Sequence, residues 1–168
     1  FSLDQVVEFA LTEDVDLVLL AGDAYKGRDP SQTHQREFAT RLTRLSNAGI
    51  PVFLLVGNHD LPSAVSRANA VEIFSTLQVP QVTVGDNLQN YLIITKAGPL
   101  QILAVPWPRR SGILTREESS GLTIMEVRDA IQDRMTAAIG LRASELDPGV
   151  PAVMAGHVSE NGTTNSSE

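Results

Sequence analysis

The sequence predicts an α/β fold in which parallel strands alternate with helices. Two short apolar runs, 15–20 and 51–56, each lead into a polar turn that contains glycine, as strands buried on both faces do. A segment with apolar residues at helical spacing separates them, so strand, helix and strand follow one another as a parallel βαβ unit requires. With 168 residues and 42% hydrophobic content, the chain can bury the core of one globular domain.

Helices are predicted on both sides of the first of these strands. Residues 3–12 form the first expected helix. Asp29 offers a cap for the second, with Pro30 at its first helical position, and Gly49 is expected to end it. One face of this second helix is apolar and consists of Phe38, Leu42 and Leu45.

The rest of the chain is expected to add two helices and four strands to the same domain. Residues 1–158 are assigned to this domain, and 159–168, which are all Ser, Thr, Asn, Gly or Glu, to a polar loop or disordered tail. The predicted elements are a helix at 63–77, strands at 81–84, 91–95 and 101–105, a helix at 123–139 and a strand at 150–155.

Composition excludes several classes of function. The chain has no cysteine, so a thiolate metal site is excluded and a metal must be held by oxygen or imidazole ligands. No apolar run reaches the roughly 20 residues that span a bilayer, so a cytoplasmic protein with no membrane segment is expected. The net charge of −7 argues against sequence-independent binding of nucleic acid. One group of basic residues is interpreted as an ordinary solvated helix face: Lys26, Arg28, Arg36, Arg41 and Arg44.

Three apolar runs end in a glycine that is followed by side chains able to bind metal. These segments are Gly22-Asp23, the four residues 57–60 (GNHD) and Gly156-His157. In open α/β sheets, ligands bind at the carboxyl ends of the strands, where such segments meet. A carboxylate can bridge two divalent ions about 3.5–4 Å apart, and a carboxamide oxygen and an imidazole can complete the shell of one of them.

The segments GDAYKGRDP, GNHD and GHVS, in this order, resemble the internal motifs of the calcineurin-like metallophosphoesterases. Residues 17–62 are similar in spacing to the SbcD-type DNA repair exonucleases, the bacterial relatives of the Mre-type nucleases. The resemblance implies a layered β-sheet core flanked by helices, an αββα sandwich. It also implies a DNA exonuclease or phosphodiesterase that works in double-strand break repair with two divalent ions. Manganese is the first choice for these ions, and the ligand types permit Mg, Fe or Zn.

The resemblance also assigns roles to particular residues. By position, Asp23 is the expected bridging carboxylate, and Asn58 and His157 are expected ligands of one metal. His59 is expected to be the non-ligand histidine that protonates the leaving oxygen, and Asp60 to orient His59.

The sequence departs from the family pattern at three places. The family opens with an Asp-x-His strand and closes with a Gly-His-x-His turn, and neither motif occurs in these 168 residues. We therefore expect the central part of such a domain, cut short at both ends, in which one metal site lacks most ligands and activity is weak or lost. Lys26 stands where the family usually has an acidic residue, which leaves its role open.

Several alternatives remain open from the sequence. A nucleotide phosphodiesterase or phosphatase of the same superfamily suits the acidic charge, and a non-catalytic fragment that only binds a partner is a further interpretation. The partners that the resemblance implies are DNA, an SbcC-type (Rad-like) ATPase subunit and a second copy, paired through the helix at 63–77. Trp107, between two prolines, could stack on a base, but a packed aromatic under an irregular loop is the interpretation preferred.

Overall fold

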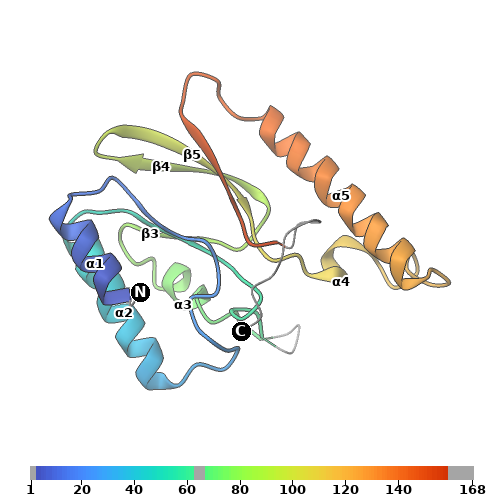
Figure 1. Cartoon of the computed structure of the whole chain (residues 1–168), viewed down its shortest axis with the longest axis horizontal. Coiled ribbons are helices and arrows are strands. Elements are labelled where there is room, and N and C mark those ends of the chain that lie inside the picture. Colours follow the sequence, from blue (N-terminus) through green and yellow to red (C-terminus); the bar gives the residue numbers. More distant parts are fainter. Residues whose placement is uncertain (1–2, 63–66, 159–168) are drawn as a thin grey trace.

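The computed structural model describes residues 3–62 and 67–158, which form two three-stranded sheets with helices on either side (Figure 1). Helices α1 (Leu3–Thr12) and α2 (Gln32–Asn47) lie side by side and cover the first sheet together with α3 (Glu72–Thr76). Helix α5 (Ile124–Ser144) lies on the other side, along the second sheet. The predicted α/β class is confirmed.

The first sheet is parallel and has the strand order β1-β2-β3. Val52 of the central strand pairs with Val18 on one side and Val82 on the other, so the predicted βαβ unit is confirmed. All four residues of β2 are buried, which is why this strand is an uninterrupted apolar run. The strands are β1 (Val18–Leu20), β2 (Val52–Leu55) and β3 (Val82–Gly85).

The second sheet has the order β4-β5-β6 and mixes two kinds of pairing. The first two strands form an antiparallel hairpin, whereas β5 and β6 are parallel. The parallel pair requires a crossover, which α4 (Arg110–Ile113) and α5 provide. The strands are β4 (Gln89–Thr95), β5 (Gly98–Val105) and β6 (Ala152–Gly156).

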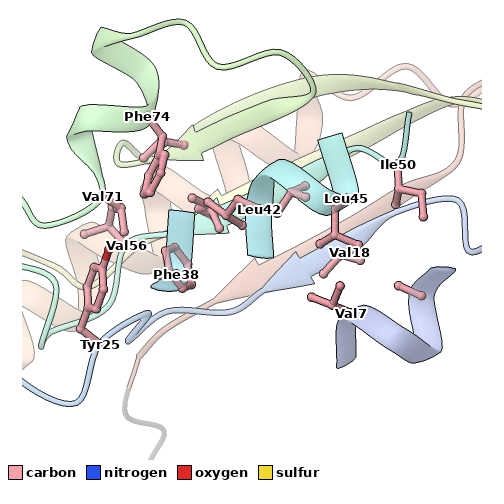
Figure 2. Close-up of a cluster of buried hydrophobic side chains, with 14 residues drawn as sticks. Val7, Val18, Tyr25, Phe38, Leu42, Leu45, Ile50, Val56, Val71 and Phe74 are labelled. Carbon is pink, nitrogen blue, oxygen red and sulfur yellow. The ribbon is translucent and has the colours of Figure 1, made fainter. Parts of the chain in front are cut away.

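Two hydrophobic clusters separate the layers. The first lies between the first sheet and its helices, where Phe38, Leu42 and Leu45 of α2 point at the sheet as predicted (Figure 2). The second lies between the two sheets and joins Phe53 of β2 to Ile102 of β5. With α5 beyond the second sheet, the layers run helix, sheet, sheet, helix, and the expected αββα sandwich is confirmed.

The starts of α2 and α3 differ from the prediction. The side chain of Ser31, rather than Asp29, caps α2, because its hydroxyl accepts the N–H of His34 at 3.3 Å. The helix predicted at 63–77 is present only at Glu72–Thr76 among the described residues, and its first part falls on 63–66, outside them. Asn69 explains the late start, because its Oδ1 accepts the N–H of Val71 in a turn that competes with helix.

The C-terminal third follows the prediction more closely. Helix α5 begins after Thr123, which forms a capping box with Glu126, and runs five residues beyond the predicted end at Ile139. The predicted tail at 159–168 lies outside the described residues. No helix in the described part of the chain is long and apolar enough to cross a membrane.

Candidate metal centre

The loops that follow β1, β2 and β6 meet at one place, where they bring three predicted ligands together. The Nε2 atom of His157 lies 3.0 Å from Oδ1 of Asn58 and 3.5 Å from Oδ2 of Asp23. The two sheets contribute jointly, because Asp23 and Asn58 follow strands of the first sheet and His157 follows a strand of the second. Side chains from distant parts of the sequence thus share one site, at the strand ends where the sequence predicted it.

A backbone carbonyl fixes which nitrogen of His157 faces the site. Its Nδ1 lies 2.7 Å from the carbonyl oxygen of Ala21, and a carbonyl oxygen only accepts, so Nδ1 carries the proton. The lone pair of Nε2 then points at the oxygens of Asn58 and Asp23. Three acceptors facing one another at this distance are stabilised when a cation sits among them, and their O, O, N chemistry suits a divalent metal.

Two glycines make this approach of the loops sterically feasible. A Cβ at Gly22 would collide with the imidazole of His157, and a Cβ at Gly57 would collide with the carboxylate and backbone of Asp23. Gly22 also has a φ of +101°, a conformation that favours glycine. Asp23 itself has a φ of +53°, and its Oδ1 accepts the N–H of His59 at 2.8 Å, which ties the first loop to the second.

His59 lies beside the predicted ligands and is oriented by a second backbone carbonyl. Its Nδ1 lies 2.6 Å from the carbonyl oxygen of Lys26 and therefore donates to it. The Nε2 atom is left to carry or accept a proton, as an acid or base near a reacting group must. Lys26, whose role the sequence left open, thus enters the site through its main chain.

Asp60 is the one fully buried carboxylate among the described residues. Its Oδ2 accepts the N–H of Gly57 at 2.9 Å. Burial raises the pKa of Asp60 above its usual range, while the hydrogen bond from Gly57 acts in the opposite direction. No hydrogen bond joins Asp60 to His59 within the described residues, so its expected role in orienting His59 stays a prediction, and the contact it makes holds the second loop.

Tyr25 anchors the first loop against α2. Its ring packs against Phe38 with centroids 5.1 Å apart, and it belongs to the buried cluster in Figure 2. Burial, with a smaller contribution from the charge of Asp60, raises the pKa of Tyr25 to about 12. The phenol therefore stays neutral at physiological pH and serves in packing.

The assembled residues fit one divalent ion rather than a complete pair. Asp23, Asn58 and His157 supply a carboxylate, a carboxamide oxygen and an imidazole that converge on one point. Across residues 3–62 and 67–158, no group of three or more His, Cys, Asp or Glu side chains could hold a metal. The donors for a second ion are therefore not assembled in the described part of the chain.

Two arginines of α2 form ion pairs with carboxylates of α1. Arg41 contacts Asp4 at 2.7 Å and Arg44 contacts Glu8 at 2.7 Å, which joins α2 to α1. These pairs agree with the interpretation of an ordinary charged helix face, and they neutralise charge that a nucleic-acid phosphate would otherwise meet.

Residues 1–160 match the family model of the calcineurin-like phosphoesterases. The chain belongs to this family. Calcineurin-like phosphoesterases use divalent metals, which agrees with the donor set that the three loops assemble. The resemblance inferred from GDAYKGRDP, GNHD and GHVS is thereby confirmed.

Several relatives of this phosphoesterase carry the names of DNA repair nucleases. The SbcD subunit of the nuclease SbcCD from Rhodobacter capsulatus is 33% identical over 118 residues, which are 63% of this chain and 29% of the relative. Its counterpart from Escherichia coli K12 is 23% identical over 171 residues, 98% of this chain and 42% of the relative. The DNA double-strand break repair protein Mre11 of Haloferax volcanii is 42% identical over 59 residues, 35% of this chain and 13% of that protein.

These comparisons identify a metallophosphoesterase of the SbcD and Mre11 type. The match covers less than half of the length of each of these relatives. The sequence did not reveal that the main-chain carbonyls of Ala21 and Lys26 orient His157 and His59, because every residue type has such a carbonyl. It also missed the contact of Trp107 with His157, whose ring centroids are 6.0 Å apart.

Proposed function

We propose that this phosphoesterase is a metal-dependent DNA exonuclease that hydrolyses phosphodiester bonds in double-strand break repair. The observation that carries the proposal is the convergence of Asp23, Asn58 and His157 on one point, with His59 beside them. The names of its relatives, nuclease and DNA double-strand break repair protein, support the choice of DNA as the substrate.

Under this proposal, each side chain of the site has a defined task. Asp23, Asn58 and His157 would hold a divalent ion, manganese as first choice. Asp23 is also the expected bridge to a second ion, whose other donors are not assembled among the described residues. Metal ions supply Lewis-acid chemistry that neutralises charge developing on phosphate oxygens. His59 would pass a proton to the leaving oxygen through Nε2, because its Nδ1 is committed to the carbonyl of Lys26 and Nε2 is the ring nitrogen that stays free.

We extend the proposal to assembly because the two SbcCD relatives are named as subunits. This chain would then work beside an SbcC-type ATPase subunit. Pairing of two copies, placed by sequence on a helix at 63–77, stays a prediction, and the described helix there is limited to Glu72–Thr76.

A nucleotide phosphodiesterase or phosphatase is the second candidate, and the charge of the chain favours it. The net charge is −7, and the basic side chains of Arg41 and Arg44 are paired with carboxylates. A small substrate needs fewer phosphate contacts than a duplex, so it tolerates this balance better.

The decisive assay compares two substrates in the presence of Mn²⁺: an end-labelled linear duplex and a small phosphodiester. The full-length protein that contains these residues is tested beside its His59→Ala and His34→Ala variants, of which His34→Ala removes an exposed histidine of α2 as a matched control. We expect duplex cleavage that falls about 10²- to 10⁴-fold in His59→Ala and is retained in His34→Ala.

Other outcomes would redirect the proposal. Hydrolysis of the small diester without duplex cleavage selects the nucleotide phosphodiesterase. Hydrolysis of neither substrate selects a non-catalytic, partner-binding role, in which the fold is kept without the chemistry. Calorimetric titration with Mn²⁺ shows whether a variant is inactive because it no longer binds metal or because it lacks the proton donor. His157→Ala should weaken Mn²⁺ binding, and His59→Ala should not.

A further inference from the structure

A cavity of about 440 Å³ is lined by Val56 and Leu61, which flank the segment 57–60, and by Trp107, whose ring contacts His157. Its volume falls in the range of about 300–1,000 Å³ that is usual for small-molecule sites. Val56, the residue before the Gly57 turn, lines it on one side, and Trp107 and Arg109 line it on another. The cavity thus opens where one part of a substrate would lie when its phosphate is at Asp23, Asn58 and His157.

The loop that carries Trp107 is fixed to the site at two points. The N–H of Trp107 donates to the carbonyl of Val56 at 2.9 Å, and the N–H of His157 donates to the carbonyl of Val105 at 2.9 Å. Its ring meets the imidazole of His157 edge-on, at 67° and 6.0 Å between centroids. The prolines on either side restrict the backbone further. Trp107 is therefore a rigid, half-buried aromatic surface at the boundary of centre and cavity.

The charges around the cavity favour a neutral, flat group over a phosphate. Asp86 and Glu72 bring two carboxylates, against one guanidinium from Arg109. Phosphate oxygens would be repelled by this excess of negative charge, whereas the exocyclic amino groups of nucleobases donate hydrogen bonds to carboxylates. Asn87 donates its Nδ2 to Asp86 at 2.8 Å, which leaves Oδ1 of Asn87 as a further acceptor.

We infer that this cavity is a base subsite, in which a nucleobase next to the scissile phosphate stacks on Trp107 and donates hydrogen bonds to Asp86 and Asn87. The inference rests on the proposed function for the position of the phosphate. A base enters such a pocket only when it is unpaired, so the subsite selects a single-stranded or frayed nucleotide. The aromatic interpreted from sequence as packing then has a face for the substrate.

The test uses the fluorescence of Trp107, which is the single tryptophan of the chain. The protein is titrated in EDTA, without divalent metal, with dAMP and with deoxyribose 5-phosphate, which lacks the base. We expect saturable quenching by dAMP and none by the sugar phosphate. Because no metal is present, the result is independent of hydrolysis, and a failed duplex assay would overturn the proposed activity without touching the base subsite.

Variants test whether stacking supplies the binding. Equilibrium dialysis of dAMP should show an affinity about tenfold or more weaker for Trp107→Leu, because a stacked base contributes about 1–3 kcal/mol. Trp107→Phe keeps a ring and should bind close to wild type. Circular dichroism confirms that both variants are folded. Equal binding of dAMP and the sugar phosphate, or unchanged affinity in Trp107→Leu, would overturn the inference.

A last experiment distinguishes a nucleic-acid strand from a free nucleotide as the source of the base. A single-stranded oligonucleotide d(A)6 is compared with dAMP under the same conditions. Tighter binding of the oligonucleotide supports a nucleic-acid strand as the source, and equal binding supports a free nucleotide. Quenching by neither probe contradicts the base subsite.

Discussion

Two glycines decide whether the residues of the site can meet. Gly22 and Gly57 lie where a methyl group would enter the space of His157 and Asp23, respectively. Gly49, which ends α2, also has a left-handed backbone but has open space around the position of a Cβ. Glycine is thus required for backbone conformation at Gly49, and for both conformation and close approach at Gly22.

This difference gives a matched pair of substitutions. Gly22→Ala and Gly49→Ala both place a side chain on a left-handed backbone, at a cost of about 1 kcal/mol in unfolding free energy. We expect the alanine at Gly22 also to displace His157 and to weaken Mn²⁺ binding about tenfold or more in calorimetric titration. Equal Mn²⁺ affinity in the two variants would show that the imidazole is not held by this contact.

Asp60 is predicted to stabilise the second loop through its buried carboxylate. Asp60→Ala leaves the N–H of Gly57 without its acceptor and should lower the free energy of unfolding by about 1–3 kcal/mol. Asp60→Asn keeps an oxygen acceptor and no longer buries a charge, so it should lower the free energy of unfolding by less than Asp60→Ala does. Urea denaturation measures both, and a loss for Asn as large as that for Ala would argue against the hydrogen bond as the cause.

The side chains of the site were predictable from sequence, and their anchors were not. Asp23, Asn58, His59 and His157 each follow an apolar run and a glycine, and parallel strand ends bring such residues together. The two carbonyls that orient His59 and His157 belong to Lys26 and Ala21, and every residue type supplies a carbonyl. Their position depends on tertiary folding alone.

Among the elements, long periodic segments followed the prediction and short polar ones did not. Apolar runs and a helical face placed β1, β2, α1 and α2, because burial of such patterns dominates their energy. The helix expected at 63–77 is present at Glu72–Thr76 but not at 67–71, where the side chains of Asn69 and Glu72 bond to nearby backbone N–H groups instead. Such local competition is hard to weigh from composition.

The junction between α4 and α5 carries a pH-dependent contact. The Arg134 guanidinium, helped by Thr115, lowers the pKa of Glu118 from 4.5 to about 2. Arg134 also donates to the carbonyl of Ile113 at the end of α4, at 2.6 Å. Because the folded state lowers this pKa, the stabilisation is complete above about pH 4.5 and is lost as the pH falls through about 2.

Glu118→Gln should therefore make the stability of the protein less dependent on pH in the acidic range. We expect its thermal midpoint to fall less steeply than that of wild type between pH 4.5 and pH 2. Glu117→Gln, an exposed neighbour whose side chain makes no ion pair within the described residues, makes the same change of charge and is the control. Identical pH profiles for Glu118→Gln and wild type would contradict the role of the ion pair with Arg134.

In the whole molecule, the site depends on both sheets being packed together. Two of its loops follow β1 and β2 in the first sheet, and the third follows β6 in the second. The hydrophobic cluster between the two sheets therefore keeps the three loops next to one another. Phe53 is central to this cluster, because it is fully buried and its ring meets Tyr91 of the opposite sheet at 5.1 Å between centroids. A Cβ at Gly85 would collide with the same ring. The two sheets should therefore unfold as one cooperative unit.

Phe53→Ala tests this coupling. The loss of a fully buried phenylalanine between the sheets should lower the free energy of unfolding by about 3–5 kcal/mol. Phe9→Ala removes a ring that is 63% exposed on α1 and should cost much less. In urea, far-UV circular dichroism reports on all elements and Trp107 fluorescence on the edge of the site, so coincident midpoints that move together in Phe53→Ala are expected. Separate midpoints for the two probes would mean that the sheets unfold independently, and that the site can be lost while the helices and the first sheet remain folded.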